Sequence, residues 1–128
     1  MAVNQEEQAV EFSRSFFTSL YEVQDGERFK NCIQCASCSG VCPYGYLMTM
    51  SPGKMISYLR AELFDKVLSN DTVWMCISCY ACTEVCPQQI PVTPGLMTRA
   101  KEELLLAGNV PNELQDALMN SQRYGNPL

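Results

Sequence analysis

The stretch CIQCASCSGVCP at residues 32–43 recurs as CISCYACTEVCP at residues 76–87. Both copies have the spacing Cys-x2-Cys-x2-Cys-x3-Cys-Pro, and together they contain all eight cysteines of the 128-residue chain. Because no cysteine lies outside the two motifs, the chemistry of the chain has to be sought in them.

The spacing of each motif is typical of the ligand runs in two-cluster iron–sulfur proteins. A [4Fe–4S] cluster needs four thiolates, one for each iron, and a Cys-x2-Cys-x2-Cys loop can reach three of the corners. In two-cluster proteins the fourth cysteine of each run ligates the other cluster. We therefore expect two [4Fe–4S] clusters, one bound by Cys32, Cys35, Cys38 and Cys86 and the other by Cys76, Cys79, Cys82 and Cys42.

Disulfides and zinc are two other uses of clustered cysteines. Disulfides belong to oxidising compartments, but the N-terminal sequence MAVNQEEQ lacks the basic and apolar regions of a secretory signal. Zinc sites usually combine two separated Cys-x2-Cys pairs rather than three cysteines within one short loop. The chain has no histidine, which excludes His-ligated zinc, Rieske clusters and His-ligated haem. We therefore favour iron–sulfur clusters in a cytoplasmic protein.

The charge and hydropathy of the chain exclude two classes of partner. The net charge is −5 and no basic run occurs, so we expect no nucleic-acid binding. No apolar stretch approaches 18 residues, so we expect no transmembrane segment. The negative charge itself is compatible with ordinary solubility or with steering of a partner.

Apolar periodicity predicts a helix over residues 6–23. Its apolar stripe consists of Phe12, Phe16, Leu20 and Val23, widened by Val10, Phe17 and Tyr21. This helix either caps the core or docks on a partner protein. Asp25-Gly26 then predicts a stop and a turn.

The residues between the two motifs read mostly as helix. Pro43 to Tyr46 predicts a turn, and Leu47, Met48 and Met50 are expected to pack near a cluster. Ser51-Pro52 is a helix start that should lead to about Phe64, with Met55, Ile56, Leu59 and Leu63 facing inward. One short turn over 65–69 should follow. Asp71 is then the expected N-cap of a short helix leading to Trp74, which with Met75 should pack over a cluster.

Two further helices are expected after the second motif. Residues 88–92 are too rich in proline for helix, and Thr93-Pro94 repeats the start signal of Ser51-Pro52. That helix should end near Gly108, with Leu96, Ala100, Leu104 and Ala107 along one face. Pro111 and Asn112 open the last helix, which places Leu114, Leu118 and Met119 on one side. A loose tail, residues 124–128, should follow.

No segment has the alternation of a strand, so we predict an all-α fold. We expect three parts: an N-terminal helix (1–25), a two-cluster α-helical ferredoxin domain (26–110), and a C-terminal helix with its tail (111–128). The helical linker distinguishes this scaffold from the small ferredoxins, which place short β-hairpins beside their clusters.

The second motif and its surroundings resemble a particular family. Trp74, Tyr80, Thr83 and Glu84 around the second set of cysteines, and Ile33-Gln34 and Ser39-Gly40 in the first, are similar to the small two-cluster subunit of heterodisulfide reductase. The resemblance covers residues 28–108, with a weaker echo in Gly125-Asn126-Pro127. It implies the α-helical ferredoxin fold. The position after Cys35, often glycine in such relatives, is Ala36, and we expect this difference to be tolerated.

The resemblance also implies a role. The small subunits of this family pass electrons between two larger ones, of which one carries flavin and clusters and the other is cysteine-rich and catalytic. The eight cysteines are the only residues whose role carries over, and no cysteine is left to act as a nucleophile. We therefore expect a non-catalytic electron-transfer subunit of an oxidoreductase complex. The alternatives are the iron–sulfur subunit of another flavin dehydrogenase or fumarate-reductase-like complex, and a structural or regulatory cluster protein.

Overall fold

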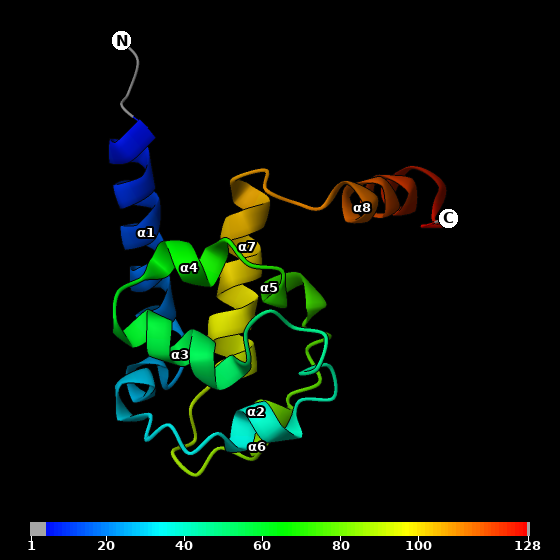
Figure 1. Cartoon of the computed structure of the whole chain (residues 1–128). Coiled ribbons are helices and arrows are strands. Elements are labelled where there is room, and N and C mark those ends of the chain that lie inside the picture. Colours follow the sequence, from blue (N-terminus) through cyan, green and yellow to red (C-terminus); the bar gives the residue numbers. More distant parts are fainter. Residues whose placement is uncertain (1–4, 128) are drawn as a thin grey trace.

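The computed structural model describes the backbone of residues 5–127 and the side chains of residues 14–127. Over this range the chain forms helices and no strand, which confirms the all-α prediction (Figure 1). In chain order the elements are α1 (Gln5–Glu22), η1 (Gly26–Asn31), α2 (Ser37–Val41), α3 (Pro52–Arg60), α4 (Phe64–Leu68), α5 (Thr72–Met75), α6 (Ala81–Glu84), η2 (Val92–Met97), α7 (Thr98–Leu106) and α8 (Asn112–Tyr124).

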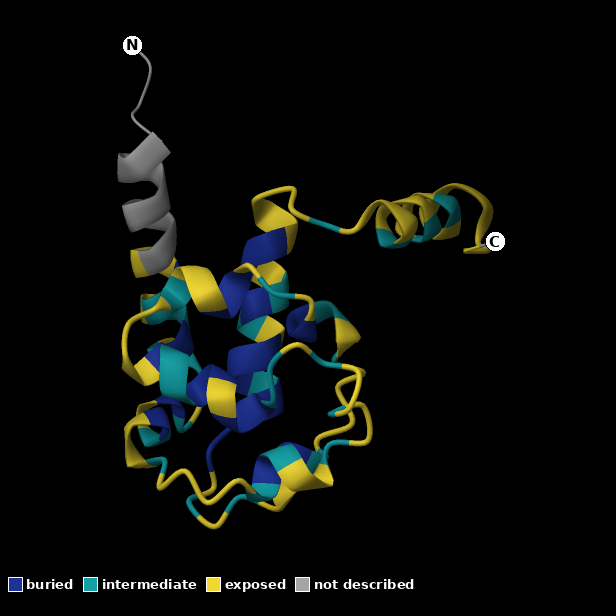
Figure 2. Cartoon of the chain, in the orientation of Figure 1, coloured by how far each residue is buried: buried dark blue, intermediate teal, exposed yellow. Residues whose placement is uncertain are grey.

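The core lies where α1, α3, α4 and α7 meet. Phe16 and Leu20 of α1 are buried, as the apolar stripe predicts, whereas Val10 and Phe12 lie outside the described side chains. Met55 and Leu59 of α3 and Leu104 of α7 complete this centre (Figure 2). Burial of each such side chain stabilises the fold by about 1.5–3 kcal/mol relative to its exposure.

The cysteine motifs form a lobe that is continuous with the core, because Cys38 and Cys82 belong to the same apolar cluster as the buried side chains of α1, α3 and α7. The short helices α2 and α6 pack against each other and lie together at one end of the molecule (Figure 1). Helix α8, in contrast, projects away from the body, and none of its residues is buried. Among the described residues, no helix is both long and apolar enough to cross a lipid bilayer.

The turn after α1 lies where it was predicted, at Asp25-Gly26. The left-handed residue is Asp25 (φ 64°), not the glycine that follows it. Gly26 is required instead by close packing, because a Cβ there would lie 2.1 Å from the Leu20 carbonyl oxygen. The predicted stop is thus correct, but each of the two residues contributes to it in a different way.

The helix that starts at Ser51-Pro52 ends earlier than predicted. The Ser51 hydroxyl accepts the Lys54 N–H, as an N-cap should. However, α3 ends at Arg60, because Glu62 adopts φ 57° and the N–H groups of Glu62 and Leu63 donate to the carbonyls of Leu59 and Tyr58. This is a Schellman closure, for which the sequence offers no glycine. Leu63, predicted to face inward, is 41% exposed.

Three smaller predictions also need correction. Asp71 precedes α5 without capping it, since its carboxylate accepts the Thr49 N–H while Asn70 accepts the Thr72 N–H. Leu47 is exposed rather than packed. Ala107 is exposed because α7 has already ended at Leu106.

The helix start predicted at Thr93-Pro94 is also shifted. A π-helical turn, η2, begins at Val92, so Thr93 lies inside the turn and its side chain caps nothing. The end of α7 agrees with the sequence, because Gly108 is left-handed (φ 69°) and the Asn109 N–H donates to the Leu104 carbonyl.

Candidate iron–sulfur centres

The two cysteine motifs fold in the same way. In the first, Gln34 and Ala36 have positive φ angles of 55° and 63°. In the second, the corresponding residues Ser78 and Tyr80 have φ angles of 57° and 65°. These left-handed residues curl each loop, and a short helix, α2 or α6, starts immediately after the second of them. The sequence repeat is therefore also a structural repeat.

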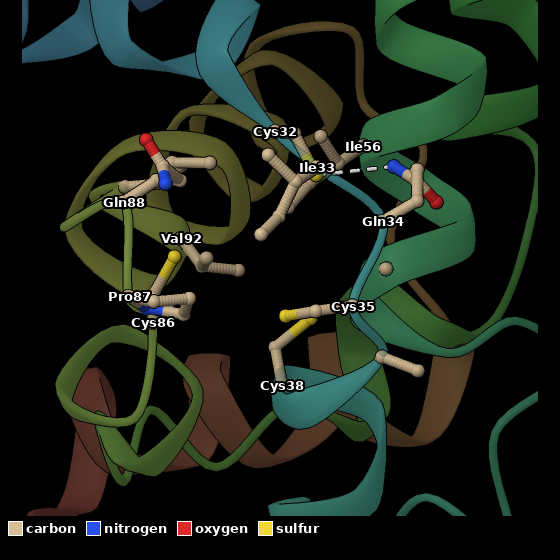
Figure 3. Close-up of a pocket in the computed structure, with 13 residues that line it drawn as sticks. Cys32, Ile33, Gln34, Cys35, Cys38, Ile56, Cys86, Pro87, Gln88 and Val92 are labelled. Atoms are coloured by element: carbon tan, nitrogen blue, oxygen red, sulfur yellow. Dashed lines mark hydrogen bonds between the residues drawn. The ribbon is translucent and has the colours of Figure 1, made fainter.

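The first pocket combines three cysteines of one motif with one of the other. Cys32, Cys35 and Cys38 line it together with Cys86, which lies across the cavity in Figure 3. Its empty volume is about 370 Å³, including the open mouth. The other lining side chains are uncharged, and most of them are apolar: Ile33, Gln34, Ala36, Ile56, Pro87, Gln88, Ile90 and Val92, with Gly53.

The second pocket has the reciprocal composition. Cys76, Cys79 and Cys82 line it together with Cys42 of the first motif, and its empty volume is about 350 Å³. The remaining lining residues are again uncharged: Pro43, Tyr44, Met48, Pro52, Ile77, Thr93 and Met97. Met48 therefore lies where the sequence placed it, whereas Trp74 and Met75 line neither pocket, contrary to their prediction.

The eight thiols differ in exposure according to their position in the motif. Cys35 and Cys79 are exposed at the outer side of their loops, whereas Cys38 and Cys82 are buried on the touching helices α2 and α6. Burial raises the pKa of both the Cys38 and the Cys82 thiol. The pKa of the exposed Cys35 thiol is lowered, because the Ser37 hydroxyl can donate a hydrogen bond to its thiolate form.

Matching hydrogen bonds hold each loop against the helix that follows it. The Ser39 hydroxyl accepts the Gly53 N–H (3.2 Å), and the corresponding Thr83 hydroxyl accepts the Thr93 N–H (2.9 Å). Ser39 and Thr83 occupy the same position in the sequence repeat, because each directly follows the third cysteine of its motif. The sequence does not reveal the groups that they bind, which are backbone N–H groups 14 and 10 residues away.

A cationic side chain donates a hydrogen bond to the carbonyl of the first cysteine in each motif. Arg60 Nη1 donates to the Cys32 carbonyl (2.7 Å), and Lys101 Nζ donates to the Cys76 carbonyl (2.6 Å). The two donors come from α3 and α7, the helices that follow the first and second motif. Sequence reasoning missed both residues, because a lone Arg or Lys on a helix carries no signal of a contact made 25 or 28 residues away.

Polar side chains of three residues lie within hydrogen-bonding distance of cysteine sulfur atoms, and Met48 Sδ lies 3.8 Å from Cys42 Sγ. Gln34 Nε2 donates to Cys32 Sγ at 3.1 Å, as drawn in Figure 3. The Cys35 thiol donates to Ser37 Oγ at 3.4 Å. In the second pocket, Thr93 Oγ1 lies 3.2 Å from Cys82 Sγ. The sequence did not indicate the contact of Thr93, because Thr93-Pro94 has the pattern of a helix start.

The two pockets fit [4Fe–4S] clusters in their donor sets. Each contains four cysteines, which is the number of thiolates a cubane requires, and neither contains a charged side chain that would compete for iron or admit water. Metal ligation requires deprotonated cysteines, and iron supplies the positive charge that offsets the burial of Cys38 and Cys82.

An all-α scaffold with two reciprocal four-cysteine pockets defines an iron–sulfur protein of the two-cluster class. Residues 25–90 match the family model described as "4Fe-4S dicluster domain". Since the match spans more than half of the chain, the protein belongs to this family of 4Fe–4S dicluster proteins, binds two [4Fe–4S] clusters and transfers electrons. No curated protein matches the chain at a significant level.

Proposed function

We propose that this chain is the electron-transfer subunit of a heterodisulfide-reductase-like complex, and that the two pockets hold its clusters with exchanged fourth ligands. Cys32, Cys35, Cys38 and Cys86 then bind one cluster, and Cys76, Cys79, Cys82 and Cys42 bind the other. The observation that carries this proposal is that each pocket is lined by three cysteines of one motif and the last cysteine of the other.

Passage of electrons through two sites needs access at each of them. Each pocket has its own exposed cysteine, Cys35 or Cys79, and beside it an exposed isoleucine, Ile33 (62%) or Ile77 (57%). A partner can therefore approach each pocket separately, while the buried Cys38 and Cys82 lie on the helices that join the two. This arrangement supports a relay between two different proteins. Each bound cluster supplies one-electron redox chemistry.

The surface around the pockets favours stable partners over transient ones. Within residues 31–53 and 72–98 the only charged residue is Glu84. Interfaces between permanent subunits are more apolar, whereas electrostatic complementarity steers rapid encounters. We infer that the partners in the cytoplasm are two heterodisulfide-reductase-like proteins, of which one bears flavin and clusters and the other is cysteine-rich and catalytic. The resemblance around Trp74 to Cys86 supports this assignment over the subunits of other flavin dehydrogenases.

We propose the same division of the chain as the sequence suggested. Residues 26–110 form the two-cluster domain, residues 1–25 a capping helix, and residues 111–128 a C-terminal extension. The burial of Phe16 and Leu20 supports capping rather than docking for the N-terminal helix. The exposed helix α8 is then the segment free to contact a partner protein.

The proposal is tested by purifying the tagged full-length chain anaerobically with its co-eluting proteins. We expect about eight irons and eight sulfides per chain, two reversibly reducible EPR signals, and co-eluting flavin-bearing and cysteine-rich proteins. Co-elution with a fumarate-reductase-like flavoprotein would support another dehydrogenase instead. Zinc, or clusters that cannot be reduced reversibly, would contradict an electron carrier. The partner-free chain should show no disulfide reduction, because all its cysteines are occupied.

A further inference from the structure

The buried cysteines of the two pockets have different surroundings despite the structural repeat. Cys82 lies 3.2 Å from the hydroxyl of Thr93, which is 1% exposed. In the first half, the residue that makes the same backbone hydrogen bond as Thr93 is Gly53. A Cβ at Gly53 would lie 3.5 Å from Cys38 Sγ but only 2.9 Å from Ser39 Oγ. The first pocket therefore has neither a hydroxyl nor room for one at this position.

Which group donates the hydrogen bond between Thr93 and Cys82 depends on whether Cys82 is protonated. Between a thiol and a hydroxyl, either group can donate. Once Cys82 binds iron as a thiolate, its sulfur has no proton, so the hydroxyl must be the donor. Within the described part of the chain, Thr93 Oγ1 makes no other hydrogen bond. Because the site is buried, water does not compete for this donor.

A hydrogen bond to a ligand sulfur affects the two redox states unequally. Reduction adds one electron, and therefore one negative charge, to the cluster and its thiolates. The sulfur then becomes a better acceptor, so the same donor stabilises the reduced state more than the oxidised state. The electron comes from the electron-donating partner in the proposed complex, or from dithionite in a measurement.

We propose that Thr93 sets the reduction potential of the second cluster by donating its hydroxyl to the Cys82 thiolate. Thr93 does not bind the cluster itself. It acts on the potential through its hydrogen bond to the ligand Cys82. This inference rests on the proposed function insofar as Cys82 must ligate a cluster. The first pocket has no counterpart of this bond: the Ser39 hydroxyl beside Cys38 is matched by Thr83 beside Cys82, and the exposed Gln34 amide on Cys32 can be replaced by solvent.

Three variants of the full-length, cluster-loaded chain test the proposal by EPR-monitored potentiometry. Thr93→Val keeps the shape and the backbone N–H of the residue but removes the hydroxyl, and should lower the midpoint potential of one cluster only. Thr93→Ser keeps the hydroxyl and should stay close to wild type. Thr98→Val is the matched control. It also removes a hydroxyl, one that donates to the Thr93 carbonyl (2.9 Å) and not to sulfur, and should shift neither potential.

The affected signal must also belong to the second pocket. Cys79→Ser perturbs that pocket directly, so the signal it alters identifies the cluster that Thr93→Val should shift. Equal shifts in both clusters, a shift as large in Thr93→Ser as in Thr93→Val, or no shift would overturn the role of Thr93. Such results would leave the proposed function intact, whereas failure to find two clusters in the wild type would remove both.

A second measurement avoids dependence on the folding of the valine variant. Electron–nuclear double resonance of the reduced wild type should detect an exchangeable proton coupled to the second cluster, and the Thr93→Ser protein should retain it. If Thr93→Val fails to load clusters, the absence of such a proton in the wild type would overturn the proposal, and its presence in both proteins would support it.

Discussion

Ala36 occupies a backbone conformation that suits glycine better. Its φ of 63° lies in the left-handed region, where a Cβ comes close to the following carbonyl oxygen. The conformation is needed because Ala36 turns the chain between Cys35 and helix α2. A glycine at this position would therefore be free of strain, whereas alanine is accommodated at a cost.

Replacing this residue should stabilise the protein. Ala36→Gly relieves strain of about 1–2 kcal/mol, from which the extra backbone entropy of glycine subtracts about 0.5–1 kcal/mol. We expect a net gain of about 0.5–1 kcal/mol, seen as a higher guanidinium midpoint for loss of the visible absorbance of the clusters.

Ala81 in the second motif offers a control for this substitution. Ala81 starts helix α6 and, unlike Ala36, does not have a positive φ angle. Ala81→Gly should therefore lower the midpoint, because glycine weakens a helix by roughly 0.5–1 kcal/mol relative to alanine. A lower midpoint in both variants would contradict strain at Ala36.

Single residues also mark the limit of prediction from the sequence. The cysteine spacing was sufficient to anticipate the composition of both pockets, because four ligands per cluster and short loops leave few arrangements. Thr93 could not be assigned in this way. Its position before a proline predicts a cap, and only the three-dimensional path of η2 brings its hydroxyl to Cys82.

At the level of elements, helix ends were harder to predict than helices. The start of α3 at Ser51-Pro52 and the end of α7 near Gly108 agree with the sequence, because each uses the residue type that favours it. The end of α3 uses Glu62 in a left-handed conformation, a residue with no such preference. Long-range packing and hydrogen bonding, rather than local propensity, decide such positions.

If the two motifs exchange their fourth ligands, a substitution in one motif should disrupt the cluster of the other motif. Cys42→Ser should disrupt the cluster of the opposite motif and free Cys76, Cys79 and Cys82, because Cys42 lines their pocket. Cys86→Ser should free Cys32, Cys35 and Cys38 for the same reason. Anaerobic alkylation followed by mass spectrometry identifies which thiols have become reactive, and the iron content should fall by about half in each variant.

Cys79→Ser is the matched control for this experiment. With exchanged ligands, it disrupts the same cluster as Cys42→Ser, so both variants should expose Cys76 and Cys82, and Cys79→Ser should also expose Cys42. If Cys42→Ser instead exposed Cys32, Cys35 and Cys38, each motif would bind its own cluster and the proposed assignment would be wrong.

In the whole molecule, the helical core and the part with the cysteine motifs are stabilised in different ways. Buried side chains such as Phe16, Met55 and Leu104 fill the core between α1, α3 and α7 and line neither pocket. The lobe with α2 and α6 has instead mostly short helices and loops, with exposed side chains between its cysteines. We infer that bound iron replaces much of the apolar core that this lobe lacks.

Removal of iron should therefore affect the two parts differently. Anaerobic chelation should increase amide hydrogen exchange over residues 32–50 and 76–91 by more than about tenfold, which corresponds to about 1.4 kcal/mol of lost local stability. Helices α3 and α7 should keep most of their protection, because α3 also packs on α4, and α7 packs on α1 and α4. Hydrogen exchange with mass spectrometry of the loaded and chelated chain measures both regions together.

The outcome decides how folding and metal binding are coupled in this protein. Equal loss of protection in both regions would mean that the clusters hold the entire chain together, as in small metal-dependent domains. Unchanged exchange in the cysteine loops would mean that the pockets form without iron. Loss confined to the loops, which we expect, would show that the helical core forms independently and presents a flexible lobe to the incoming clusters. The hydrogen bonds that Arg60 and Lys101 of that core make to the Cys32 and Cys76 carbonyls would then guide the loops into place.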